Sequence, residues 1–459
     1  MARLRPYAAV CAIAAVLWAA IGHGFANYDA LYALIWGREL AHGQAPQVDV
    51  QLAPTTHPLA NLLGVVLSAL PARTAEDVLV VIAYLALAAA GWLVFRLGRL
   101  WFGWAAGLLA AVVLLTREPV ISYGVRAYVD VPYLVLVLGA LLVEARRARA
   151  GAPVLALLAL AGLVRPEAWL FSLAYLAYLR TGRRVRPSEV ALAASAIVLW
   201  LGYDLVTSGD ALRSLHDTRQ GTRELGRDTG IAKVPVTLPR RVGEVLREPG
   251  LVGAVAGLAL GWGLLRERMR LLVASGVLAV VAFAVLGAAG LPILTRYAFV
   301  VAALGAVLCG GGAFGWMAVT DGRWVWRWRL VGLVVIGLLI GFAPWQEHRL
   351  RSTARAISTQ QRIRDDLYAL LDERRLPSGR VGVANHRLVP LVALVTNRGP
   401  QSIVTPPAAG LRSFVGPATS KVARQFILDP HDPTKQVAGA PAGMREVARN
   451  ASWVLYERG

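Results

Sequence analysis

Twelve apolar segments, separated by short polar loops, run through residues 1–344 of this 459-residue chain. Hydrophobic residues make up 56% of the sequence and charged residues only 17%, whereas soluble domains average about 25% charged residues. Apolar runs that recur in this way predict an all-α polytopic membrane protein and exclude an ordinary soluble enzyme or a disordered protein. The segments are 7–22, 57–70, 77–95, 101–116, 131–144, 152–164, 167–179, 187–207, 250–265, 271–290, 297–318 and 330–344.

Clusters of arginine between these segments predict the orientation of the chain. Short basic loops lie on the cytoplasmic side of membrane proteins, and here they occur at 96–99, 146–149, 180–186, 266–270 and 323–329. All of these loops lie on the cytoplasmic side only if the number of spans before the tail is odd. Twelve segments are one too many, so the short segment 57–70 is interpreted as re-entrant or interfacial. We expect about 11 transmembrane helices, a cytoplasmic N-terminus and an extracytoplasmic tail, in the plasma membrane of a bacterial cell. Alternatively, 152–164 and 167–179 form one broken helix, which changes the count.

The chain divides by composition into two expected domains. A transmembrane domain, 1–344, carries external loops at 23–56, 117–130 and 208–249, and the tail 345–459 shifts to a polar composition. The tail combines helical and strand-like patterns, which predicts a small extracytoplasmic α/β domain of ordinary size. Its helical patterns lie at 352–374 and 387–396, and its strand-like runs at 381–384, 403–404 and 453–456.

The formal net charge of +20 would suggest nucleic-acid binding in a soluble domain. Trp324, Trp326 and Trp328, which alternate with arginines, also resemble a nucleic-acid patch. At the cytoplasmic end of a span, however, this pattern is typical of an aromatic belt with basic anchors. We therefore expect the arginines to contact membrane lipid and predict no nucleic-acid partner.

No pattern in the sequence predicts a metal or a cofactor. The two cysteines, Cys11 and Cys309, lie inside apolar runs and do not have the spacing of a zinc site or a disulfide framework. No Gly-rich phosphate loop follows a strand, which argues against a nucleotide-driven pump.

The first external loop contains a predicted helix with a carboxylate in its first turn. Asn27 is a suitable N-cap, the helix is expected to run to about His42, and Gly43 can end it. Asp29 then lies close to the membrane surface. Two interpretations stay open: the carboxylate complements the helix dipole, or it takes part in chemistry.

Ionisable residues also lie at the expected external ends of later segments. Arg126 and Asp130 lie just before a span. They are either a helix cap and an interfacial anchor, or a functional pair. Arg165 and Glu167 occupy a tight hairpin, where a local ion pair is the plain alternative. Arg296 is either an interfacial anchor or a functional group. Arginine on this face opposes the positive-inside bias, so topology does not explain it.

Short motifs in the first 180 residues resemble the membrane-embedded GT-C glycosyltransferases, in particular the protein O-mannosyltransferases and the lipid A aminoarabinose transferases. The rest of the chain resembles them only in architecture. The matching residues are Tyr28-Asp29, Leu31-Tyr32, Arg38-Glu39-Leu40, Gly43, Asp49 and His57-Pro58-Leu59 in the first loop, Arg126, Asp130 and Pro132 in the second, and Arg165-Pro166.

The resemblance implies a GT-C-like transferase that moves a sugar from a polyprenyl-phosphate donor to an extracytoplasmic acceptor, which is a cell-envelope glycan, a lipid or a protein. Asp29 occupies the position of the first-loop catalytic carboxylate and Asp130 that of the second acidic residue. Because guanidinium groups bind phosphate bidentately, the expected donor-phosphate ligands are Arg126, Arg165 and Arg296. The expected substrate-binding residues are Tyr28, Tyr32, His57, Tyr128 and Glu167. Arginines that neutralise the phosphate make a metal unnecessary, so we expect metal-independent, inverting transfer.

Two other functions fit part of the pattern. A lipid-linked sugar flippase or transporter would also bury charges in the membrane, but it would show repeated halves, and none is evident. A polysaccharide polymerase or ligase would be expected to place its key arginines in the loop 208–249.

Overall fold

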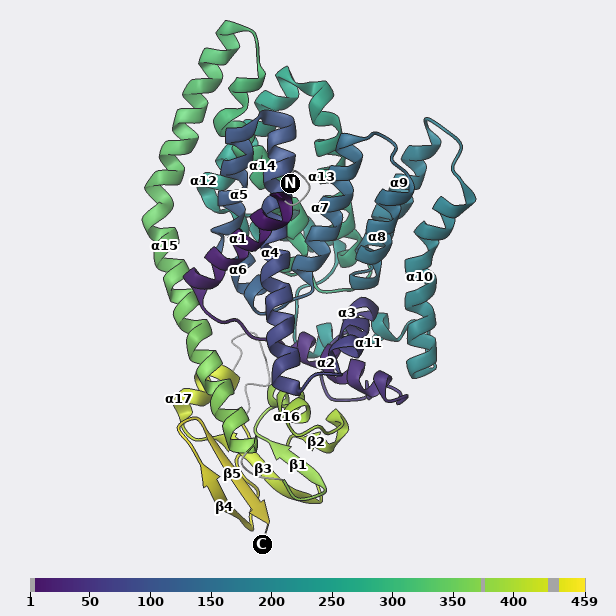
Figure 1. Cartoon of the computed structure of the whole chain (residues 1–459), viewed down its shortest axis with the longest axis vertical. Coiled ribbons are helices and arrows are strands. Elements are labelled where there is room, and N and C mark those ends of the chain that lie inside the picture. The colour runs from purple at the N-terminus through teal and green to yellow at the C-terminus, as the bar shows by residue number, and fades with distance from the viewer. Residues whose placement is uncertain (1–4, 373–375, 428–436, 459) are drawn as a thin grey trace. The chain divides into compact units, whose positions relative to one another are not determined.

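The computed structural model describes residues 5–372, 376–427 and 437–458 (Figure 1). The chain forms two compact units, each assembled from separate stretches of sequence. Unit 1 comprises residues 1–21, 82–201 and 228–354, and unit 2 comprises 22–81, 202–227 and 355–459. This division differs from the expected boundary at residue 344, because two earlier stretches of the chain pack with the tail in unit 2.

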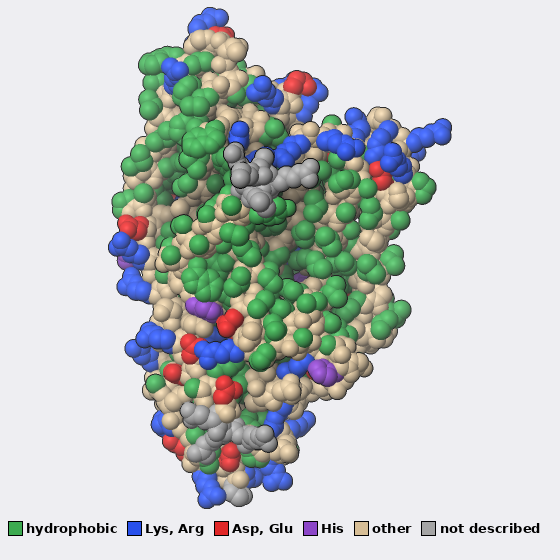
Figure 2. Space-filling model, in the orientation of Figure 1, with side chains coloured by type: hydrophobic (Ala, Val, Ile, Leu, Met, Phe, Trp, Pro, Cys, Tyr) green, Lys and Arg blue, Asp and Glu red, His purple; other side chains and the backbone are tan. Residues whose placement is uncertain are grey.

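Unit 1 is helical, and three of its helices continue into unit 2. In the space-filling view, hydrophobic side chains cover most of the face that its helices present (Figure 2). The chain is thus an integral membrane protein. The helices are α1 (Arg5–Ile21), α4 (Ala72–Phe102), α5 (Trp104–Leu115), α6 (Glu118–Val125), α7 (Asp130–Arg146), α8 (Ala152–Val164), α9 (Glu167–Arg180), α10 (Pro187–Ser208), α12 (Val234–Leu264), α13 (Arg266–Ala288), α14 (Phe299–Phe314) and α15 (Gly322–Asp372).

The number of spans is set by helix length and hydropathy. Within the described residues, 5 helices are long and apolar enough to cross a membrane, or 6 if α5 and α6, which are bent by 65°, count as one span. The figure of 11 is not confirmed and stays a prediction. α8 and α9 pack against each other as separate helices, so the alternative of one broken helix is wrong. The segment 57–70 forms a helix of only 10 residues, about 15 Å long, which is too short to span.

Close packing of α12 against α14 depends on glycine. A Cβ atom added to Gly257 would lie 1.9 Å from the Leu308 carbonyl oxygen, and one added to Gly312 would lie 2.2 Å from the Gly253 carbonyl oxygen. Small residues that let two backbones approach are the usual means of helix association in membranes, where no hydrophobic effect drives it.

We expect Gly257→Ala to lower the thermal unfolding temperature of the purified protein, because the new methyl group pushes α12 and α14 apart. Overpacking of this kind costs about 1–3 kcal/mol. Gly263→Ala, on the same helix, is the matched control, since nothing lies within 4 Å of its added Cβ. Equal unfolding temperatures for the two variants would contradict this account of the contact.

The longest helix joins two elements that the sequence suggested were separate. α15 has 51 residues and runs without interruption through Pro344, so the expected span 330–344 and the expected helix 352–374 are one element. Proline removes one backbone donor, but kinks and proline are tolerated in membrane helices. The residues after it are good helix formers, which carry the helix onward.

Unit 2 combines a five-stranded sheet with helices from the first half of the chain and two short helices from the tail. The strand order is β2-β1-β3-β5-β4, in which β1 is parallel to β2 and β3, and β5 is antiparallel to β3 and β4. The three expected strands are confirmed, and β3 and β4 were not expected. The strands are β1 (Arg380–Val383), β2 (Ile403–Val404), β3 (Leu411–Pro417), β4 (Met444–Arg449) and β5 (Trp453–Arg458). The helices are α2 (Tyr28–Ala41), α3 (Pro58–Leu67), α11 (Arg213–Glu224), α16 (Val389–Val395) and α17 (Ser420–Val422).

The loop 23–56 and the tail are joined directly within unit 2. α16 packs on α2, and Arg38 donates hydrogen bonds to the carbonyl oxygens of Leu394 at 3.4 Å and Arg398 at 3.1 Å. The backbone of Gln401 donates to Gln47 at 3.1 Å. The tail is therefore the packing partner of the first loop.

Candidate functional site

A buried ion pair forms the centre of the candidate site in unit 1. Asp130 begins α7 and is 2% exposed, and Arg165 directly follows α8 and is 6% exposed. The Arg165 Nη1 donates to Asp130 Oδ1, and its Nε donates to Glu167 Oε1 at 3.2 Å. A charge buried to this degree is stable only when paired. The local ion pair expected within the hairpin is present, and it extends to Asp130.

Aromatic rings enclose the Arg165 guanidinium. Its Cζ lies 3.8 Å from the centre of the Tyr297 ring and 6.0 Å from that of Tyr133. A desolvated cation over an aromatic face is stabilised by the ring quadrupole. Together with the two carboxylates, these contacts fix the Arg165 side chain in place.

Two further arginines lie at the same site and share one tyrosine. The Arg296 Cζ lies 5.2 Å from the Tyr128 ring centre, and the Arg126 Cζ lies 5.5 Å from it. Arg296 Nε is 3.8 Å from Asp130 Oδ2, too far for a hydrogen bond. Arg126 donates to the carbonyl oxygen of Ser122 at 2.8 Å and to its hydroxyl at 2.6 Å. Both guanidinium groups thus lie at the ring of Tyr128.

Cations exceed carboxylates in this group, which contains three arginines and the two carboxylates of Asp130 and Glu167. A small cavity of about 10 Å³ adjoins them, lined by Tyr133, Arg165, Glu167, Arg296 and Tyr297 on its polar side and by apolar residues of α9, α13 and α14 elsewhere. The surplus of positive charge favours an anionic group, and guanidinium groups bind phosphate well.

The turn that carries Arg296 is tied to α12. Thr295 donates to Glu244 Oε2 at 2.6 Å, and Arg241 donates to the same carboxylate at 3.0 Å. Burial opposes ionisation of Glu244, but these hydrogen bonds and the arginine charges outweigh it and lower its pKa. The ionised carboxylate thereby holds the turn in position.

The first-loop residues lie in unit 2. Asn27 caps α2 by accepting from the backbone N–H of Asp29 at 2.7 Å and of Ala30 at 3.1 Å, as the sequence predicted. Asp29 is half-buried in the first turn. The rings of Tyr28 and Tyr32 meet edge to face at 5.0 Å. Desolvation raises the pKa of both phenols, so they remain protonated donors, and Tyr28 donates to the Leu52 carbonyl oxygen at 3.1 Å.

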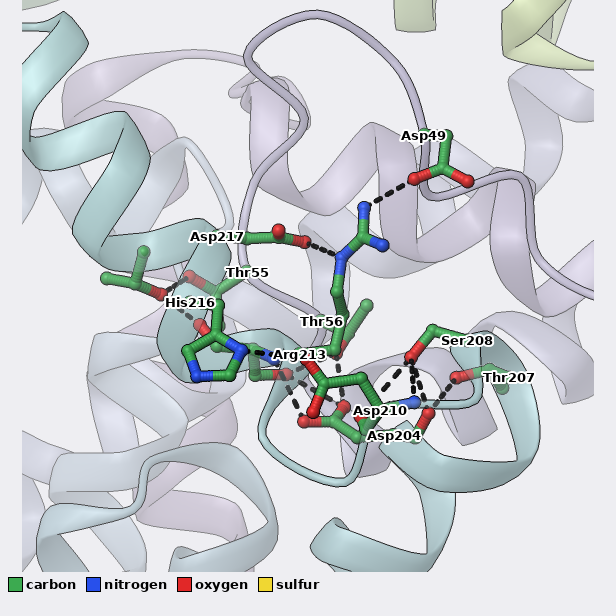
Figure 3. A network of polar contacts seen from close by, with 12 residues as sticks. Asp49, Thr55, Thr56, Asp204, Thr207, Ser208, Asp210, Arg213, His216 and Asp217 are labelled. Carbon is green, nitrogen blue, oxygen red and sulfur yellow. Dashed lines mark hydrogen bonds and ion pairs between the residues drawn. The ribbon is translucent and has the colours of Figure 1, made fainter.

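The end of the first loop is fixed by a polar network with α10 and α11 (Figure 3). Asp204 accepts from the Ser214 backbone at 3.0 Å, from its hydroxyl at 2.8 Å and from Thr56 at 3.3 Å. Arg213 reaches from α11 to Asp49 at 2.5 Å and to Asp217 at 2.6 Å. His57, which follows Thr56, occupies the N-cap position of α3 without capping it through its side chain.

The structure thus brings the predicted residues into two groups. Asp130, Arg165, Glu167, Arg296, Arg126 and Tyr128 lie together in unit 1, and Tyr28, Asp29, Tyr32 and His57 lie in unit 2. Tyr133 and Tyr297 were not predicted. Signals for both existed: Tyr297 follows Arg296 directly, and Tyr133 lies three residues after Asp130, on the same face of the helix.

Comparisons with known proteins establish the fold. No protein-family model and no curated protein matches the sequence. Among solved structures, the chain is similar to ArnT from Cupriavidus metallidurans bound to undecaprenyl phosphate, with a TM-score of 0.56 and 13% identity over 97% of both chains. It is also similar to the archaeal oligosaccharyltransferase AglB from Archaeoglobus fulgidus in complex with an inhibitory peptide and a dolichol-phosphate, with a TM-score of 0.50 and 12% identity over 94% of this chain and 72% of that one. The GT-C fold expected from the sequence is confirmed.

Proposed function

We propose that the chain is a membrane glycosyltransferase that moves a sugar from a polyprenyl-phosphate donor to an extracytoplasmic acceptor. The observation that carries the proposal is the surplus of positive charge around Tyr128, where Arg126 and Arg296 each lie within 5.5 Å of the ring centre. The solved structures with the same fold support it, since ArnT was crystallised with undecaprenyl phosphate and AglB with a dolichol-phosphate.

The proposed donor site uses each charged residue differently. Arg126 and Arg296 bind the phosphate, because their two positive charges are held together at the ring of Tyr128. Arg165 is already committed to Asp130 and Glu167, so it keeps the two carboxylates from repelling the phosphate. Asp130 in turn attracts Arg296, whose Nε lies 3.8 Å away, and orients it toward the donor. This division of roles is what the contacts favour.

The proposed reaction is a single displacement. Asp29 accepts the proton of an acceptor hydroxyl as the hydroxyl oxygen attacks the anomeric carbon. The bond from that carbon to the phosphate oxygen breaks at the same time, and the anomeric configuration inverts. The electron pair leaves with the lipid phosphate, and fixed cations stabilise the charge that develops there. Arginines perform the role that a metal ion has in other phosphate-transfer sites, so we propose metal-independent transfer.

The decisive experiment incubates the purified full-length protein with defined polyprenyl-phosphate sugars and extracts of candidate acceptors, in buffer that contains EDTA. Lipid analysis then measures donor consumption and release of polyprenyl phosphate. We expect consumption of at least one donor at a rate that EDTA does not change. Movement of an intact lipid-linked sugar across a vesicle membrane without any consumption would instead identify a flippase.

Arg296→Gln is expected to lower kcat/KM for the donor by about 10- to 150-fold, mainly by raising KM. The estimate corresponds to the loss of one hydrogen bond to a charged group, about 1.5–3 kcal/mol. Arg270→Gln is the matched control, because Arg270 is exposed on α13 and pairs only with Glu267 in the described structure, at 2.7 Å. Donor titrations of both variants check the prediction, and equal KM values would remove Arg296 from the donor site.

A further inference from the structure

A second group of arginines lies in unit 1 and shares no residue with the group around Asp130. Its members come from three elements: Arg117 lies at the break between α5 and α6, Arg247 at a kink in α12, and Arg349 on α15. Trp345 and Gln346 of α15 lie among them. No part of the proposed transfer reaction uses these residues.

Arg117 is a buried cation whose partners are neutral. The residue is 4% exposed, its Nε donates to the Val113 carbonyl oxygen at 3.0 Å, and its Nη1 donates to Gln346 Oε1 at 3.2 Å. Within the described part of the chain, no carboxylate forms an ion pair with it. Removing a guanidinium from water without an opposite charge is costly, so an anion at this point would be strongly favoured.

Arg247 is held close to this cation in an unusual backbone conformation. Its φ of 61° and ψ of 171° interrupt α12, in a region that glycine alone adopts readily. The kink places the Arg247 guanidinium 4.7 Å from the Trp345 ring centre, near enough to Arg117 for the two charges to repel each other. Among the described residues, its side chain has neither an ion pair nor a hydrogen bond. A strained residue that adds to charge repulsion is difficult to explain by stability alone.

Arg349 completes the group and lies near the same tryptophan. Its Cζ lies 5.5 Å from the Trp345 ring centre, and its Nη2 lies 3.5 Å from Glu118. The group therefore contains three arginines and one carboxylate. The exposed Glu248 follows Arg247 in the sequence, and counting it as a second carboxylate still leaves more cations than carboxylates. The nearby Glu347 is taken up by Arg351 at 2.5 Å. The group has a net positive charge that no described residue balances.

The helix that carries Trp345 also shows what kind of anion fits. Leu333, Val334, Leu338 and Ile340 of α15 are 65%, 59%, 43% and 67% exposed, and Trp345 itself is 40% exposed. The Phe342 ring packs against that of Trp345 at a tilt of 41°, with the ring centres 4.6 Å apart. This apolar surface leads along α15 to the arginines. A ligand with hydrocarbon chains on the apolar surface and a phosphate at the arginines would match both parts.

We propose that Arg247 and Arg349 bind the phosphate of an anionic membrane lipid whose chains lie along α15, and that the charge of the buried Arg117 adds to the attraction. The indole of Trp345, which lies near both guanidinium groups, packs against the glycerol region of the headgroup. The alternative occupant, a free phosphate ion, would use the same arginines but not the apolar surface. In a third case, the arginines and Trp345 anchor the protein at the membrane interface without selecting a lipid. The test also distinguishes this outcome.

The test uses the full-length protein in neutral detergent and native mass spectrometry with added phosphatidylglycerol. We expect one phosphatidylglycerol to remain bound to the unchanged protein and phosphatidylcholine to be retained far less. The double variant Arg247→Gln/Arg349→Gln is expected to bind phosphatidylglycerol about 30-fold more weakly, from the effect of two lost cations near a lipid headgroup. Arg351→Gln, a neighbouring exposed arginine on α15, is the matched control and is expected to bind as the unchanged protein does.

Three results would overturn the proposal. The first is equal retention of phosphatidylglycerol by the double variant and the unchanged protein. The second is equal retention of the two lipids, which would indicate anchors without selectivity. The third is displacement of phosphatidylglycerol by millimolar inorganic phosphate, which would indicate a site for a free anion. If the double variant does not fold, Arg349→Gln alone, at a side chain that is 45% exposed, gives the same comparison with a smaller expected effect.

Discussion

Asp29→Asn is expected to reduce the rate of sugar transfer by about 10²- to 10⁴-fold, the contribution of a positioned general base. Asparagine has the same shape but cannot accept the proton. The fold of the loop is expected to persist, because Asn27 caps α2 through the backbone N–H of Asp29 and not through its side chain. Initial rates with saturating donor and acceptor measure the effect, and donor KM is expected to stay within a few-fold of its original value.

The control for this variant is Asp49→Asn in the same loop. Asp49 pairs with Arg213 at 2.5 Å, and its side chain is 71% exposed, so its loss is expected to change the rate little. Transfer at the original rate by folded Asp29→Asn would show that the base lies elsewhere. A loss of activity in both variants would indicate that the loop as a whole needs its acidic charge.

Arg165→Met is expected to destabilise the protein by about 3–5 kcal/mol, because it leaves Asp130 buried without its cation. Asp130→Leu is expected to have an effect of similar size, since Arg165 would keep only Glu167. The double variant Asp130→Leu/Arg165→Met is expected to lose much less than the sum of the two. Chemical unfolding of all four proteins completes a double-mutant cycle that gives the coupling energy.

The exposed pair Glu446 and Arg449 in the β4 strand is the comparison for that cycle. The two side chains are 42% and 48% exposed and 2.7 Å apart, so breaking this pair is expected to cost less than about 1 kcal/mol. If the coupling energy between Asp130 and Arg165 is no larger than that of the exposed pair, the description of Asp130 and Arg165 as a desolvated pair is contradicted.

The charged residues that lie together around Asp130 were easier to single out from the sequence than the bounds of the helices that hold them. Arg165 and Arg296 stood out because arginine on the expected external face opposes the positive-inside bias, a signal that needs no knowledge of packing. Their joint relation to Asp130 is a long-range contact, and no local pattern encodes it. The same holds for Tyr133 and Tyr297, whose role is visible only once α7 and the Arg296 turn lie beside Arg165.

Local signals predicted local structure well and boundaries poorly. The cap at Asn27 predicted α2 correctly because a short polar side chain there serves two backbone donors. In α15 the local signals were misleading: a proline and a change to polar composition suggest the end of an element, yet the helix continues for 28 residues beyond Pro344. β3 and β4 escaped prediction because their apolar alternation is weak, and strand pairing rather than local pattern stabilises them.

The pairing of α2 with the tail has a consequence for biosynthesis. Arg38 and Arg398, which are joined by a hydrogen bond, are 360 residues apart in the chain. At about 5–20 residues per second, a ribosome needs roughly 20 to 70 s to make that stretch. The newly inserted first loop must therefore wait at the membrane, without its partner helix α16, until nearly all of the chain has been synthesised. During that time its apolar face is open to chaperones and proteases, so the yield of folded protein should depend on the speed of elongation.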